Sequence, residues 1–198
     1  MDIENWAAGI DCRIEDGDIH LSNIRGAQTA IRGEDGEIEI DNLSGDLAID
    51  VEDGDVNLTA CEMPSCRVES EDGGITISQS KGSYDLIVDD GNVVMKKIEA
   101  KGLNISSEDG DIEVELLAGE PLNADIKTDD GDINIDLEKQ FSVTFFVSAN
   151  DSDSIRIGFD NIEGYKKDKQ TKSGSLNGGT GRLRIQTADG DVKIKERW

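Results

Sequence analysis

The sequence predicts an all-β fold, and within that class a single-domain β-solenoid whose coils contain about 19 residues and two or more short strands each. Three observations predict it. An Asp-Gly pair recurs at a nearly fixed interval, an alternating apolar pattern follows each pair, and the first 140 residues contain no stretch with helical periodicity. Repeats that each contact only their neighbours build solenoids.

The Asp-Gly pairs set the length of the repeat. The intervals between their aspartates are 19, 18, 19, 18, 19 and 21 residues, and the aspartates are Asp16, Asp35, Asp53, Asp72, Asp90, Asp109 and Asp130. Further acids recur with the pair, as in the identical stretches EDGDI at 15–19 and 108–112. Because Asp supports turns and Gly adopts a positive φ without steric cost, the pairs mark the corners of a repeating unit.

Two apolar segments follow each corner. The first alternates with period two, and its apolar positions are Ile19 and Leu21, Ile38 and Ile40, Val56 and Leu58, Ile75 and Ile77, Val93 and Met95, Ile112 and Val114, and Ile133 and Ile135. In four units a second glycine follows the first after nine residues, at Gly26, Gly45, Gly82 and Gly119, and another apolar stretch comes next. Each unit therefore contains two short strands and two turns.

Two architectures fit such a unit. In a β-solenoid each unit forms one coil, and like residues stack about 4.8 Å apart in parallel ladders. In an antiparallel meander each Asp-Gly pair is the centre of a hairpin, which would set Glu15 against Asp18 and Glu34 against Glu37, although like charges opposite each other destabilise a strand pair. The solenoid also stacks acids. It is favoured because stacking explains why one turn recurs at one period.

The period ends after Asp130. Residues 141–149 (FSVTFFVSA) hold three of the four Phe residues, and 173–182 form a loop rich in Gly and Ser before an eighth Asp-Gly pair at Asp189. A solenoid needs protected ends. We therefore expect one domain, with repetitive acidic coils over 1–140 and an aromatic and glycine-rich C-terminal cap over 141–198 that includes the last strand.

The net charge of the chain limits the classes of partner that it can bind. The net charge is −24, and it divides into −26 for residues 1–140 and +2 for residues 141–198. Nucleic acid and anionic membrane surfaces are disfavoured, because binding them requires clustered cations. The chain has no apolar run long enough for a transmembrane helix, and its first residues lack the pattern of a signal peptide. Residues 1–14 already resemble part of a repeat, so this start leaves the localisation open.

The repeated units resemble a known family. The stretches EDGDIHLSNIRGAQTAI, LSGDLAIDVEDGDVNL, TDDGDINIDL and GTGRLRIQTADGDVKI are similar to the tandem G-D-I units of bacterial adhesin-like domains, a family of unknown function with β-solenoid structure. The resemblance implies a non-enzymatic adhesin-like or scaffold module of the cell envelope or exterior. Its expected partner is an envelope protein, a cell-surface protein or a glycan, and homo-oligomers fit the same picture. The family motif is a structural turn and strand, so it assigns no catalytic, cofactor or metal residues.

An alternative is a calcium-dependent structural solenoid. Calcium takes six to eight oxygen ligands, which stacked carboxylates could supply. The repeat matches neither the nonapeptide of calcium-binding β-rolls nor a helix-loop-helix calcium loop. The competing interpretation is that Asp supports the turn while the flanking acids stay solvated. We therefore expect no cofactor and keep calcium as the alternative.

A second alternative is a carbohydrate-active enzyme similar to polysaccharide lyases. Such clefts combine carboxylates with cations, whereas residues 1–140 carry only 10 scattered Lys and Arg. His20 lies between two inward positions and should face solvent, and no catalytic motif is present. The expectation is that the protein is not an enzyme.

Two smaller features leave alternatives open. Cys61 and Cys66 flank a four-residue loop that a disulfide could close, with Cys12 left single, or all three are free thiols. The patch YKKDKQTK at 165–172 either docks an anionic glycan or a second copy, or is a solvated loop.

Overall fold

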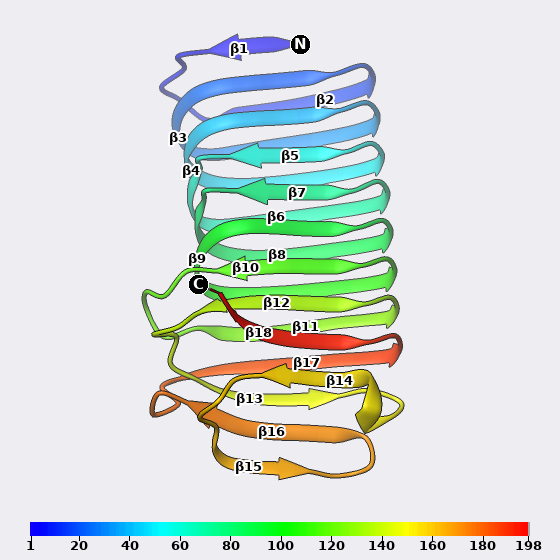
Figure 1. Cartoon of the computed structure of the whole chain (residues 1–198). Coiled ribbons are helices and arrows are strands. Elements are labelled where there is room, and N and C mark those ends of the chain that lie inside the picture. The colour runs from blue at the N-terminus through cyan, green and yellow to red at the C-terminus, as the bar shows by residue number, and fades with distance from the viewer. Residues whose placement is uncertain (198) are drawn as a thin grey trace.

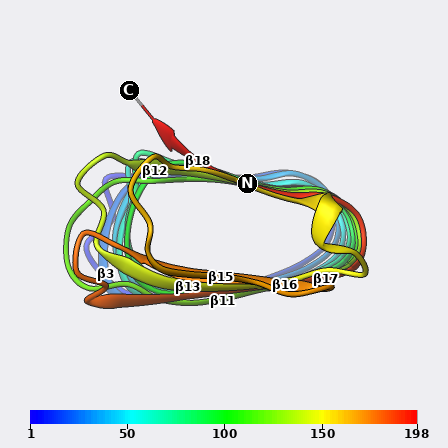
Figure 2. The same ribbon diagram turned by 60° about the horizontal axis from the view of Figure 1, so that its bottom comes forward.

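The computed structural model describes residues 1–197 as a flattened tube of stacked coils (Figures 1 and 2). In chain order the strands of the regular coils are β1 (Asp2–Glu4), β2 (Ile10–Asp16), β3 (Ile19–Asp35), β4 (Ile38–Asp53), β5 (Val56–Thr59), β6 (Glu62–Asp72), β7 (Ile75–Ser78), β8 (Lys81–Asp90), β9 (Val93–Asp109), β10 (Ile112–Leu116), β11 (Asn123–Asp130) and β12 (Ile133–Glu138). The C-terminal region contains β13 (Val143–Ser148), the 3-10 turn η1 (Ser152–Ser154), β14 (Ile155–Gly158), β15 (Glu163–Lys167), β16 (Thr171–Leu176), β17 (Gly181–Asp189) and β18 (Val192–Arg197).

The all-β solenoid predicted from the repeat is confirmed. Every pairing among β1 to β12 is parallel, with equivalent residues of successive coils in register, as in Ile19 against Ile38 and Ile75 against Val93. The antiparallel meander is therefore wrong. Each coil has a first face after its Asp-Gly corner and a second face before the next corner, and the long strands β3, β4 and β9 bend through both.

The core is a thin aliphatic layer between the two faces. The alternating apolar residues of the first face all point inward and are at most 2% exposed. The second face contributes equivalent columns, for example Ile49, Val68, Leu86 and Ile105. Burying an aliphatic side chain of this size contributes about 1.5–3 kcal/mol. Hydrophobic burial along the whole tube therefore holds the coils in register.

Glycine at the Asp-Gly corner is required by the stacking of one corner on the next. Gly36 has a φ of 128°, and a Cβ atom there would lie 2.4 Å from the Gly17 carbonyl oxygen. The Gly36 N–H donates to the Asp53 carbonyl of the next coil at 3.1 Å. The corners form a straight column, which is the right-hand edge of Figure 1 and is named the Asp-Gly edge below.

A third corner, at the end of the first face, is absent from the sequence prediction. Here one residue in each of the first six coils adopts the left-handed conformation with φ between 51° and 57°, at Asn5, Asn23, Asn42, Ala60, Gln79 and Lys97. Asn tolerates this conformation better than most residues. The Asn42 side chain also donates to the Asn23 Oδ1 atom at 2.6 Å, so the first coils carry a short asparagine ladder.

The C-terminal region does not stack in chain order. Strand β17 lies between β11 and β13, and β18 lies between β12 and β14. The chain therefore passes over one coil position, forms β13 to β16, and returns to fill the vacant position with its last Asp-Gly unit (Figure 1). Beyond β13, strands β16 and β15 continue the second face in antiparallel pairing.

Candidate functional site: the glycine-edge groove

A groove runs along the edge opposite the Asp-Gly corners. It consists of two adjoining cavities of about 460 and 420 Å³ that share Pro64, Lys81 and Gly82. Together they are lined by Gly26, Ser44, Gly45, Glu62, Met63, Pro64, Lys81, Gly82, Ser83, Glu99, Ala100, Lys101, Gly119 and Glu120. Both volumes fall within the range of ligand-binding pockets. This surface is named the glycine-edge groove.

Small residues and β-bulges hollow out this edge. A Cβ atom at Gly45 would lie 1.9 Å from the Gly26 carbonyl oxygen, and one at Gly82 would lie 1.7 Å from the Met63 carbonyl oxygen. The pairing register also shifts here, for example between Ser44 and Leu47. Backbone therefore forms much of the floor, with peptide groups close to the surface.

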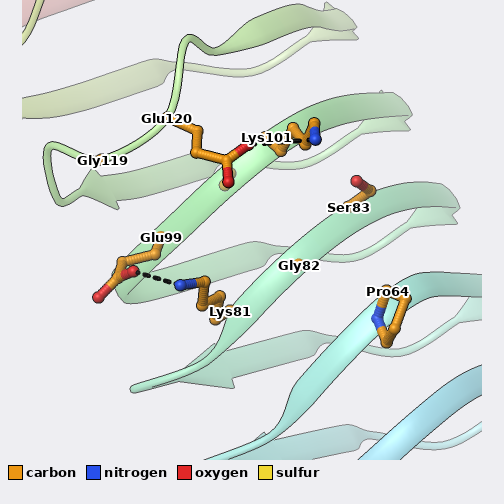
Figure 3. Close-up of a pocket in the computed structure, with 9 residues that line it drawn as sticks. Pro64, Lys81, Gly82, Ser83, Glu99, Lys101, Gly119 and Glu120 are labelled. Atoms are coloured by element: carbon orange, nitrogen blue, oxygen red, sulfur yellow. Dashed lines mark ion pairs between the residues drawn. The ribbon is translucent and has the colours of Figure 1, made fainter.

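Two ion pairs form the rim of the groove (Figure 3). The Lys81 Nζ atom lies 3.3 Å from Glu99, and the Lys101 Nζ atom lies 3.1 Å from Glu120. Each pair joins residues one coil apart, and all four side chains are between 46% and 72% exposed. Exposed pairs of this kind contribute little to stability, about 0–1 kcal/mol. Their charged groups are free to exchange partners with a ligand.

The Asp-Gly edge presents a different surface. Eight aspartates, from Asp16 to Asp189, stack in register, and in seven of these corners another acid precedes the aspartate. Desolvation, followed by the neighbouring carboxylates of Asp72 and Asp35, raises the pKa of Asp53. Within residues 1–197 no three His, Cys, Asp or Glu side chains are grouped to hold a metal ion.

The acid that follows the corner glycine has a structural role. The Asp55 Oδ1 atom accepts the Gly74 N–H at 2.8 Å, and Asp132 accepts the Asp191 N–H of the adjacent coil at the same distance. Asp18, Asn92 and Asp111 make equivalent bonds. A side-chain oxygen at this position therefore ties each coil to the next, which turn chemistry alone does not predict.

The residues singled out in the sequence do not gather into one site. His20 faces outward, about 3.7 Å from both Asp2 and Asp41. All three cysteines are free, so the disulfide alternative does not hold in this structure. Cys61 and Cys66 are buried in the core, where desolvation and the neighbouring Cys61 raise the pKa of Cys66.

The lysine patch forms part of the hairpin of β15 and β16. Lys167 contacts Asp153 at 3.3 Å, whereas Lys172 points toward the interior and donates to the Ile155 carbonyl oxygen. The glycine-edge groove was not predicted from the sequence. The sequence feature that could have indicated this groove is a pair of opposite charges one repeat apart, which occurs at Lys81 and Glu99 and at Lys101 and Glu120.

The sequence is similar to one known family of domains. The family model of the Toastrack domain DUF4097 matches residues 4–79 and 43–195, which is nearly the whole chain. No curated protein and no solved structure matches. Among the described residues no helix is long and apolar enough to cross a membrane. The chain belongs to the Toastrack family, a β-solenoid domain of unknown function.

Proposed function

We propose that this member of the Toastrack family is a non-enzymatic, adhesin-like or scaffold module of the bacterial cell envelope that binds a neutral glycan chain along the glycine-edge groove. The observation that carries the proposal is the groove itself, which crosses several coils and has a rim of paired Lys and Glu side chains. A groove that repeats with the coils suits a ligand that is itself an extended repeating chain.

The chemistry of the groove supports a neutral, polyhydroxylated ligand. Ammonium groups donate hydrogen bonds and carboxylates accept them, so the pairs Lys81–Glu99 and Lys101–Glu120 match hydroxyl groups, which do both. The lining holds two Lys and three Glu residues and is nearly neutral. An acidic polymer would be repelled by the coils around it, which carry a net −26 over residues 1–140.

A binding role fits these side chains better than catalysis. A lyase requires a base held close to cations that neutralise the substrate carboxylate. Here each cation of the rim is paired with a carboxylate, and Lys81 and Lys101 are 63% and 72% exposed. Solvent screens such groups, which favours reversible contact with a ligand.

Filling the groove tests the proposal. Ser83 lies in the groove, whereas Ser106 lies outward on β9 away from it, so Ser83→Trp and Ser106→Trp make the same substitution in two places. Binding to an array of neutral and acidic glycans is the measurement. We expect neutral glycans to bind the parent chain and Ser106→Trp, and Ser83→Trp to lose at least tenfold in affinity. A chain that binds no glycan, or that binds equally after Ser83→Trp, would overturn the assignment.

The competing calcium-dependent role has a separate test. The melting temperature is measured in millimolar calcium and in a chelator, and we expect the same value, because Asp55, Asp111 and Asp132 already accept backbone N–H groups. A rise of several degrees in calcium would favour the structural-calcium alternative. Envelope localisation is tested by fractionating the producing bacterium, in which a chain confined to the cytosolic fraction would contradict the proposal.

A further inference from the structure

The cations of this acidic protein gather at the C-terminal end of the tube. A cavity of about 360 Å³ at the free edge of β14 is lined by Arg156, Lys172, Lys193 and Lys195, with Asp153 as the acidic residue of the lining. Residues 141–198 as a whole carry a net +2. The Debye length at physiological salt is about 8 Å, so the distant acidic coils are largely screened here. The local potential in the cavity is therefore set by its own cations.

Two of these cations have carboxylate partners and two do not. Arg156 lies 3.1 Å from Asp191, and Lys195 lies 3.3 Å from Asp136. Among residues 1–197 neither Lys172 nor Lys193 contacts a carboxylate closely enough to form an ion pair. Lys193 stands directly opposite Arg156 in the pairing of β18 with β14. Lys172 and Lys193 therefore line the same cavity as the paired Arg156 and are open to an incoming anion.

The free edge of β14 adds a backbone donor. In the regular coils, the N–H of a core-facing residue after the corner donates to the next coil, as in Ile112 to Asp132 at 2.9 Å. Strand β14 is paired with β18 on one side, and core-facing Ile155 directs its carbonyl away from β18 to Lys172. Alternation along the strand aims the N–H of Ile157 at the same free edge, and Ile157 also lines the cavity.

Desolvation at this end of the tube affects Lys172. Burial, and then the nearby charge of Lys167, lowers its pKa, and the opposing effect of the Asp153 carboxylate is smaller. An anion bound beside it would strengthen that opposing effect. Cationic side chains and a backbone N–H around one cavity match the several charged oxygens of a phosphate group better than the two oxygens of a carboxylate.

We propose that the cavity bounded by Arg156, Lys172, Lys193 and Lys195 binds a phosphate-bearing anion. This site is cationic whereas the glycine-edge groove is nearly neutral, and it goes beyond the neutral-glycan function. The phosphate could belong to a soluble molecule or to the headgroup of an anionic lipid, since the oxygen atoms recognised are the same. Lys193 is the residue to test, because its side chain is exposed and forms no ion pair with another residue of 1–197.

The experiment uses the full chain and compares Lys193→Glu with Lys96→Glu. Lys96 is also an exposed lysine on the same face of the tube, in β9, and the same substitution gives the two variants the same net charge. Inorganic pyrophosphate is titrated calorimetrically at low salt, and co-sedimentation is measured with vesicles of phosphatidylglycerol or of phosphatidylcholine. Circular dichroism confirms that both variants are folded.

We expect the parent chain and Lys96→Glu to bind pyrophosphate alike, and Lys193→Glu to bind about tenfold more weakly. Co-sedimentation with phosphatidylglycerol vesicles that Lys193→Glu abolishes would also support the site and would assign the phosphate to a lipid headgroup. Three results would overturn the proposal: no binding of either probe by the parent chain, equal weakening by both substitutions, or unchanged binding by Lys193→Glu.

Discussion

The close stacking of the Asp-Gly corners predicts that one substitution has different costs at two glycines. Gly17 lies at the first corner with a φ of 108°, and a Cβ atom there would meet no atom within 4 Å. Gly54 lies at an inner corner with a φ of 148°, and a Cβ atom there would lie 2.1 Å from the Gly36 carbonyl oxygen. Gly17→Ala therefore measures backbone strain alone, and Gly54→Ala measures strain together with the contact between coils.

The expected difference follows from the geometry. Backbone strain at a positive φ costs about 1–3 kcal/mol in either variant. At Gly54 the new contact is also more than 1 Å shorter than the 3.4 Å at which ordinary contact begins. Relieving it separates two coils where the N–H of Gly36 donates to Asp53 at 3.1 Å and that of Ile38 donates to Asp55 at 2.9 Å. Weakening both bonds costs about 1 kcal/mol each, so we expect Gly54→Ala to lose about 2 kcal/mol more than Gly17→Ala.

Equilibrium unfolding in urea, followed by circular dichroism, measures both free energies. The dependence of the free energy on urea concentration must be compared first, because a repeat protein that loses cooperativity unfolds over a broader range. Equal losses in the two variants would refute the argument that backbone contact between successive corners restricts this position to glycine.

Three further predictions concern the carboxylates and the thiols. Asp132→Ala should lower the free energy of unfolding by about 1 kcal/mol in urea denaturation, because the Asp191 N–H loses its acceptor, whereas Asp132→Asn keeps an acceptor and should change it by less than about 0.5 kcal/mol. Desolvation and neighbouring carboxylates raise the pKa of Asp53, so the Asp53 carboxylate of the folded chain binds a proton at a higher pH than that of the unfolded chain. Protonation therefore favours the folded state, and the melting temperature should rise as the pH falls from 7 through this raised pKa. A fall in the melting temperature over that pH range would contradict the prediction. Ellman's reagent should modify half-buried Cys12 in the native protein and buried Cys66 only after denaturation; rapid native reaction of Cys66 would show that the core opens.

The coil could be predicted from the sequence because a fixed repeat length places each residue directly above the equivalent residue of the next coil. Ile19, Ile38 and Val56 occupy one column in the structure as they occupy one position in the repeat. Because the units are so alike, the sequence does not show in which order they stack. Asp189 stacks on Asp130 as well as any neighbour in the repeat would, so nothing in the motif shows that the last unit lies inside the stack.

The glycine-edge groove could not be predicted from a single unit, because it exists only between units. Its ion pairs join Lys81 to Glu99 and Lys101 to Glu120, and its floor depends on close packing of Gly82 over Met63. The left-handed corner could not be predicted for a different reason. Asn23 and Asn42 readily adopt a positive φ, but the equivalent positions of other coils hold Ala60, Gln79 and Lys97, so the corner has no constant residue type in the sequence.

The distribution of charge determines which surfaces are open to partners. An acid after the corner glycine stabilises the stack through a backbone hydrogen bond, but the preceding rows of exposed carboxylates make no such bond and raise the pKa of Asp53. These rows repel the equivalent edge of a second copy and any anionic polymer. A neutral chain is thereby directed to the opposite edge, where Lys81 and Lys101 balance their acids. An anion is directed to the C-terminal end, where Lys193 forms no ion pair with any acid among residues 1–197. The two proposed sites therefore differ in salt dependence: added salt should weaken anion binding strongly and glycan binding little.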